Sequence, residues 1–223
     1  MRWKKVFGNF AVCTALIISG CLYFDVKLAE FVKEIGVSPL LWGPVGSIPD
    51  MLFWLVCVTT AFAWTGRLYL SMKPVKSWNG NFFEHIGCSV PLAFVLKHLL
   101  KDLFGRTSTQ FWLLHPEQLG FHWFHGGGDF SAFPSGHMTV FTALVLGVSR
   151  YFPRLRPVCL GLLFILALTL ILTQYHFFSD LVAGIYLGVI ADLLVWRALL
   201  LLHRSSNVPS KLPCHGARGG CDI

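Results

Sequence analysis

Long apolar runs alternate with short polar connectors along most of this chain. Six of the runs are long enough to cross a bilayer as helices, which takes about 20 residues with some tolerance for tilt. They lie near Val6–Phe24, Met51–Leu70, Ile86–Leu103, Met138–Phe152, Val158–Thr173 and Leu181–Leu202. The pattern predicts an all-α, polytopic membrane protein with six transmembrane helices in a single domain over residues 1–203.

The composition agrees with this interpretation. Hydrophobic residues make up 55% of the chain and charged residues only 13%, whereas soluble domains carry about 25% charged residues. The net charge of +7 would suit a nucleic-acid-binding protein, but the basic residues cluster between apolar runs. We therefore expect membrane lipids as partners and no nucleic acid. Residues 204–223 are polar and rich in Pro and Gly, which is typical of a disordered tail.

The distribution of basic residues predicts the orientation. Six spans return the C-terminus to the side of the N-terminus, and that side receives 13 of the 18 Lys and Arg residues. An excess of Lys and Arg on short loops marks the cytoplasmic side. We expect both termini there and the long connector at residues 105–137 on the opposite, extracytoplasmic side.

The first run has two interpretations. Its basic start and the sequence Ile18–Cys21, which resembles a lipoprotein cleavage box, are compatible with a signal peptide cleaved before Cys21. The apolar run continues through Leu22–Phe24, which favours an uncleaved first helix. A short, solvated surface helix is expected to follow, from the helical spacing of Lys27, Glu30, Lys33 and Glu34.

Three polar clusters fall at the outer ends of predicted helices. The first contains Lys97 and Lys101, which are four residues apart and share a helix face, followed by Arg106. Basic residues at a helix end can also simply extend toward the lipid headgroups. This cluster alone therefore leaves both a binding role and an interfacial role open.

The second cluster, Phe133–His137, comes directly before the fourth run. Ser135 suits a helix N-cap and Gly136 permits close backbone approach, so the free N–H groups of the first turn would bind a phosphate. His137 in that turn is placed to exchange a proton with the bound group. The alternative is a capped helix with an incidental interfacial histidine.

The third cluster is His176 and Asp180, at the start of the sixth run. A carboxylate that binds one ring nitrogen fixes the tautomer and leaves the other nitrogen as a nucleophile or base. The alternative is an Asp favoured by the helix dipole beside a boundary histidine.

Together these clusters resemble the type 2 phosphatidic acid phosphatase family, which shares its fold with vanadium haloperoxidases. The resemblance rests on Lys101…Arg106, Pro134–His137 and His176-x-x-x-Asp180, and it covers residues 97–188 well. It implies a bacterial inner-membrane lipid phosphatase of the cell envelope, with its active site facing the periplasm.

The resemblance also implies a role for each residue. His176 would attack phosphorus and form a phosphohistidine, Asp180 would orient it, and His137 would protonate the leaving oxygen and then activate water. The phosphate oxygens would be held by Lys101, Arg106, Ser135 and the N–H of Gly136. No metal or cofactor is implied, because fixed cations and helix-end N–H groups can neutralise the transferring group.

Two positions depart from the family pattern. Ser108 and Leu170 stand where members of the family carry arginine. Losing one such donor commonly costs about 10²–10³ in rate. Lys97, one turn before Lys101, is the candidate replacement. A catalytically weak homologue with altered chemistry is the alternative.

The predicted function is hydrolysis of a lipid phosphate at the outer leaflet. The substrate candidates are undecaprenyl diphosphate, lipid A phosphate, phosphatidylglycerol phosphate and phosphatidate. A lipid-to-lipid phosphotransferase of the same fold and a non-enzymatic membrane protein stay open, as does the oligomeric state. A transporter would carry charged residues midway through several spans. Here the spans are almost free of them, with Asp192 as the main exception.

Two groups of residues suggest a metal site only weakly, because neither has a standard ligand spacing. One group lies in the aromatic connector, and the other lies in the C-terminal tail. The group in the connector is His115, His122, His125 and Asp129. The group in the tail is Cys214, His215 and Cys221. We interpret the connector as an aromatic lid near the lipid headgroups.

Overall fold

The computed structural model describes residues 3–36, 48–72 and 78–206. Apart from one isolated bridge between Arg106 and Phe121, the regular structure of these residues is helical. The main helices are α1 (Trp3–Ser19), a π-helical turn (Gly20–Phe24), α2 (Asp25–Ile35), α3 (Ile48–Ser71), α4 (Trp78–Phe104), α5 (Thr109–Leu114), α6 (Gly136–Tyr151), α7 (Arg156–Leu172) and α8 (Phe178–Ser206). Three short 3-10 turns are Pro116–Gln118, Gly128–Phe130 and Pro153–Leu155.

The predicted all-α class is confirmed, and each apolar run coincides with a helix. The first run covers α1 and the π-helical turn, and the others correspond to α3, α4, α6, α7 and α8. The boundaries differ in places: α4 begins at Trp78, eight residues before the predicted run, and residues 204–206, expected in the tail, still belong to α8. The rest of the predicted tail lies outside the described residues.

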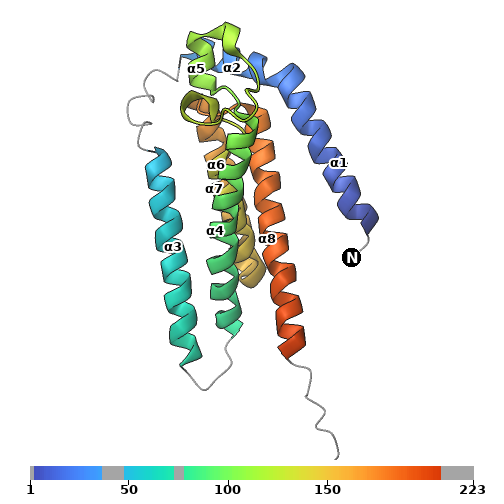
Figure 1. Ribbon diagram of the computed structural model, residues 1–223, viewed down its shortest axis with the longest axis vertical. Coiled ribbons are helices and arrows are strands. Elements are labelled where there is room, and N and C mark those ends of the chain that lie inside the picture. The colour runs from blue at the N-terminus through green and yellow to red at the C-terminus, as the bar shows by residue number, and fades with distance from the viewer. Residues whose placement is uncertain (1–2, 37–47, 73–77, 207–223) are drawn as a thin grey trace, which may run out of the picture.

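The helices form a bundle with its polar clusters at one end. In Figure 1, α2 and α5 lie across the end at which α4 finishes and α6 and α8 begin. Within the bundle α4 packs against α3, α6 and α8, and α6 packs against α7 and α8. The bundle therefore brings together three chain segments that are far apart in the sequence.

Four stretches are long and apolar enough to span a membrane. They are Phe10–Ile35, Met51–Ser71, Pro153–Leu172 and Phe178–His203. Outward-facing side chains such as Trp54 and Phe62 on α3 and Phe164 on α7 are exposed, as contact with lipid requires. Two central helices are not in this set, because α4 carries charged residues and α6 has only 16 residues. The structure is compatible with six spans, and that count stays a prediction.

The interior of α4 contains Pro91, which has no backbone N–H and cannot bind the carbonyl one turn earlier. That carbonyl belongs to Gly87, and it accepts a hydrogen bond from the indole N–H of Trp64 on α3 at 3.2 Å. A side chain of the neighbouring helix thus satisfies the oxygen that the proline leaves unpaired.

A glycine sets the close approach of α8 to α6. A Cβ atom at Gly184 would lie 2.6 Å from the carbonyl oxygen of Ser135, so any other residue would force the two helices apart. Beside this contact the backbone N–H of Ser135 donates to the carbonyl of Asp180 at 3.0 Å. The second and third polar clusters of the sequence are therefore joined directly.

Asp192, the charge within the last run, is paired in the bundle. It is 1% exposed and accepts hydrogen bonds from His85 of α4 at 2.8 Å and from Arg150 of α6. Since an unpaired carboxylate inside a membrane bundle is costly, these bonds explain how Asp192 is tolerated. One side chain thereby connects three helices.

The predicted surface helix is present as α2, but it is only partly solvated. Its charged residues Lys27, Glu30, Lys33 and Glu34 are exposed. The opposite face is buried at Asp25, Ala29 and Val32. Ala29 packs with Trp112 of α5 and with Phe177, next to His176. The sequence pattern identified the exposed face and missed the buried one.

Candidate active site

The N-terminus of α6 carries several of the candidate site residues. Ser135 is the N-cap, with its hydroxyl accepting from the N–H of Met138. Gly136 and His137 occupy the first turn. The local structure is the one that the sequence predicts, with N–H groups at a helix start suited to binding an anion.

Lys97 lies directly over this helix start. A Cβ atom added to Gly136 would lie 2.8 Å from Cδ and 3.1 Å from Nζ of Lys97, so glycine makes room for the lysine. Lys97 is only 5% exposed, and its Nζ lies 4.4 Å from the centre of the Phe94 ring. A buried lysine thus lies where the first turn of α6 would hold a phosphate.

The two candidate catalytic histidines are neighbours. The ring centroids of His137 and His176 lie 6.4 Å apart, and the Tyr175 ring lies 5.7 Å from that of His137. His176 precedes α8 rather than lying in it. Burial lowers the pKa of His176, against the opposing effect of the Asp180 carboxylate, so its ring is neutral at pH 7. A neutral imidazole is the form that can attack phosphorus.

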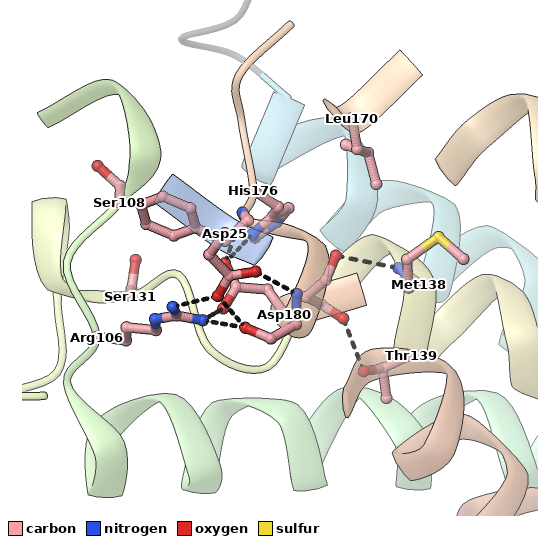
Figure 2. Close-up of polar contacts among 12 residues, drawn as sticks. Asp25, Arg106, Ser108, Ser131, Met138, Thr139, Leu170, His176 and Asp180 are labelled. Atoms are coloured by element: carbon pink, nitrogen blue, oxygen red, sulfur yellow. Dashed lines mark hydrogen bonds and ion pairs between the residues drawn. The ribbon is translucent and has the colours of Figure 1, made fainter. Parts of the chain in front are cut away.

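Two hydrogen-bond donors, the N–H of Phe177 and the guanidinium of Arg106, hold the Asp180 carboxylate next to His176. Its Oδ2 accepts from the N–H of Phe177 at 2.9 Å and lies 3.6 Å from Nδ1 of His176. Its Oδ1 accepts from the guanidinium of Arg106 at 2.5 Å. This arrangement leaves Nε2 of His176 as the nitrogen that does not face the carboxylate (Figure 2).

Arg106 does not lie where the sequence predicts it. Its guanidinium is buried between two carboxylates, donating to Asp180 and, at 2.7 Å, to Asp25 of α2. The charge is satisfied there, so the side chain turns away from the phosphate site. The structure joins Arg106 to the support of His176 instead (Figure 2).

A cavity of about 570 Å³ opens beside His176. Its wall includes Lys97, Lys101 and Tyr175, together with polar groups from the connector. The remaining lining residues are His98, Asp102, Ser108, Gln110, Gly127, Gly128, Asp129, Ser131 and Ala132. Arg106 and His137 are not part of this wall. The cavity places a substrate beside His176 and both lysines, and the ring nitrogens of His176 are themselves buried.

The two positions where arginine is absent have different surroundings, one on the cavity wall and the other in an apolar cluster. Ser108 lies on the cavity wall and caps α5 by accepting from the N–H of Phe111. Leu170 is 4% exposed and packs with Met138 and Leu181 in an apolar cluster. At position 108 a small side chain lines the cavity in place of a guanidinium, and at position 170 hydrophobic packing replaces it.

The histidines of the connector make local contacts. His122 lies beside Thr107 and Gln118, His125 lies 2.9 Å from the carbonyl of Trp123, and His115 stacks on Phe111. In the described part of the chain no group of three or more His, Cys, Asp or Glu residues has the geometry of a metal site. Cys214, His215 and Cys221 lie outside that part.

Asp25 is the site residue that the sequence analysis missed. It is 2% exposed and binds Arg106 and Ser179, close to His176 and Asp180. Its signal in the sequence is an acidic residue directly after an apolar run, where a carboxylate is costly unless it is paired. Nothing in the local pattern indicates which residues pair with it.

The chain is similar to known proteins over most of its length. A family model described as "PAP2 superfamily" matches residues 85–204. The lipid A 1-phosphatase of Rhizobium etli is 28% identical over 205 residues, covering 84% of this chain and 81% of that protein. A lipid A 1-phosphatase of Rhizobium johnstonii is 28% identical over 217 residues, covering 90% of this chain and 80% of that protein.

A solved structure gives a weaker similarity. It is a crystal structure of a transmembrane PAP2-type phosphatidylglycerolphosphate phosphatase from Bacillus subtilis. The alignment covers 92% of this chain and 90% of that chain. The sequences are 16% identical and the TM-score is 0.37, too low for a comparison of individual residues.

Proposed function

Since this chain belongs to the PAP2 superfamily and is a membrane lipid phosphatase, we propose that it hydrolyses its lipid phosphate through a phosphohistidine on His176. The observation that carries the proposal is the 6.4 Å separation of the His137 and His176 rings, beside a cavity lined by Lys97 and Lys101. Two imidazoles at this spacing can act on opposite sides of one phosphoryl group.

In the first step Nε2 of His176 attacks phosphorus while the bond to the lipid oxygen breaks. His137, as imidazolium, gives its proton to that oxygen. Nδ1 of His176 keeps its proton, directed toward Asp180, which stabilises the charge that forms on the ring. Lys97, Lys101 and the first-turn N–H groups of α6 stabilise the oxygens of the transferring group.

In the second step water attacks the phosphohistidine. His137, now neutral, takes a proton from the water while the bond between phosphorus and Nε2 breaks. Inorganic phosphate leaves, and His176 is again neutral. Every charge that develops in this cycle faces a fixed group of the chain, so the chain's own residues supply the acid, the base and the cations.

As the substrate class we propose a glycolipid with a phosphorylated sugar headgroup, of the kind that the two Rhizobium relatives are named for. The cavity of about 570 Å³ holds more than a phosphate. Its wall carries Asp102, Asp129 and Gln110, which are suited to binding sugar hydroxyl groups. The acyl chains would remain in the bilayer, at the periplasmic leaflet of a bacterial inner membrane.

A metal-free phosphate-release assay tests the function. Purified protein in detergent, with a chelator present, is given lipid A bearing only its 1-phosphate, phosphatidate, phosphatidylglycerol phosphate and undecaprenyl diphosphate. We expect lipid A to be preferred and His176→Ala to lose at least about 10³-fold in rate. Glu117→Gln, an exposed change outside the cavity, is the control with unchanged activity.

Two results would contradict the proposal. Full activity of His176→Ala would eliminate the phosphohistidine. Appearance of the phosphate on an added acceptor lipid, rather than as inorganic phosphate, would identify a phosphotransferase. A preference for phosphatidate over lipid A would reject the sugar headgroup and leave the mechanism intact.

A further inference from the structure

A carboxylate from the N-terminal part of the chain reaches the catalytic end of the bundle. Asp25 begins α2, 60 residues before the stretch that the family model matches. Its Oδ1 accepts from the backbone N–H of Ser179 at 2.9 Å. Its Oδ2 accepts from the hydroxyl of Ser179 and from Arg106. Asp25 therefore binds the first turn of α8, one residue before Asp180.

Arg106 transmits this contact to the nucleophile. One terminal nitrogen donates to Asp180 at 2.5 Å and the other donates to Asp25 at 2.7 Å. The guanidinium lies over the Phe177 ring, 4.7 Å from its centroid, and the whole side chain is 3% exposed. The planar fork of an arginine fixes the direction of both bonds at once. The position of the Asp180 carboxylate is thus coupled to that of Asp25.

Loss of Asp25 would release this coupling. With one carboxylate gone, the Arg106 nitrogen that donates to Asp25 would be free to turn toward Asp180 and form a two-point pair, the geometry that arginine and carboxylate prefer. The other nitrogen, which also donates to the Ser179 hydroxyl at 2.6 Å, would give up that bond. The rotation would draw Asp180 away from the N–H of Phe177 and from His176. A substitution without an acceptor at position 25 would also leave the Ser179 N–H buried and unpaired, which is unfavourable, whereas the amide oxygen of Asp25→Asn can still accept from it.

A second contact of α2 holds the loop that carries His176. The side-chain amide of Gln174, which is 1% exposed, donates to the carbonyl of Ala29 at 2.9 Å. Ala29 is four residues after Asp25, on the same face of the helix. The buried face of α2 thus contacts the chain on both sides of His176, at Gln174 and at Ser179.

We propose that Asp25 is a positioning residue for the phosphatase reaction, acting through Arg106 on the Asp180–His176 pair. The inference rests on the proposed function of His176. It gives the N-terminal part of the chain a role in catalysis, because α2 lies before the matched region and supplies the second carboxylate that binds Arg106. It also gives Arg106 a role other than binding phosphate.

The test separates catalysis from substrate binding. We expect Asp25→Asn to lower kcat by about 10- to 100-fold, as small displacements of a reacting group do, while KM changes less than about threefold. Glu30→Gln, on the exposed face of the same helix, should leave both constants unchanged. Thermal unfolding curves of the purified variants in detergent show whether each variant is folded at the assay temperature.

A double-mutant cycle identifies Arg106 as the intermediary. If Asp25 acts through Arg106, Asp25→Asn combined with Arg106→Gln loses no more activity than the worse single variant. Additive losses, or an unchanged kcat per folded Asp25→Asn molecule, would overturn the inference. His176→Ala is run beside them. If His176→Ala is inactive while Asp25→Asn is fully active, only this inference fails; an active His176→Ala removes the proposed function itself.

Discussion

At the scale of single residues, the cations around the phosphate differ from those of the family pattern. Neither Ser108 nor Leu170 carries a charge, and Arg106 is bound to carboxylates. Lys97 and Lys101 are the cations on the cavity wall, and Lys97 also lies over the start of α6. In our proposal Lys97 supplies part of the stabilisation that two arginines provide in other members.

Replacing Lys97 measures this contribution. We expect Lys97→Gln to lower kcat/KM by about 10²–10³, the usual loss when one donor to a transferring group is removed. Lys33→Gln, which removes an exposed lysine from α2, is the matched control. Phosphate release from the preferred lipid is the measurement. Activity of Lys97→Gln within twofold of the unaltered protein would show that Lys97 has no part in catalysis.

At the scale of elements, the site depends on how closely α6 and α8 approach each other. The Ser135 carbonyl lies where the Cβ of any residue other than glycine at position 184 would be. The helix proposed to bind the phosphate and the helix that begins beside His176 are thereby fixed relative to one another. Close helix contact through small residues is a usual means of packing in membranes.

An added methyl group at this contact should damage the site. We expect Gly184→Ala to be destabilised by about 1–3 kcal/mol, the usual effect of overpacking, and to lose phosphatase activity. Gly161 of α7 has open space around it, so Gly161→Ala should keep both properties. Thermal unfolding in detergent and phosphate release measure the two effects. Equal behaviour of both variants would mean that α6 and α8 tolerate separation.

At the scale of the whole molecule, the catalytic end and the basic loops lie at opposite ends of the bundle. The cavity is lined by the last turns of α4, by the connector and by the residues just before α8, whereas Arg150, Arg154 and Arg156 lie at or beyond the other end of α6. In Figure 1, α2 and α5 lie at the first of these two ends. The excess of basic residues on one side predicts that this second end is cytoplasmic. The proposed site would then face the periplasm.

Labelling of single cysteines tests this orientation. In a version without the seven native cysteines, Glu117→Cys near the site and Arg154→Cys at the opposite end both replace exposed residues. A maleimide that cannot cross the membrane should label Glu117→Cys in intact cells and Arg154→Cys only after the membrane is permeabilised. The reverse labelling pattern would place the site in the cytoplasm and contradict the predicted topology.

The sequence by itself determined the helices and the end of the bundle where the chemistry lies. Apolar runs specify membrane helices because a bilayer admits few other structures. Once the runs alternate in direction, the end of α4 and the starts of α6 and α8 must come together. His137, His176 and Asp180 could therefore be assigned to one site before any coordinates were known.

Only the tertiary structure decided which groups the long charged side chains bind. Arg106 pairs with residues 81 and 74 positions away in the chain, and Lys97 lies over Gly136 of another helix. A flexible side chain takes the direction that satisfies its charge in the folded protein, and no local pattern contains that information. For the same reason the local pattern predicts a solvated helix at α2, and only the fold shows that one face of α2 is buried against the loop that carries His176.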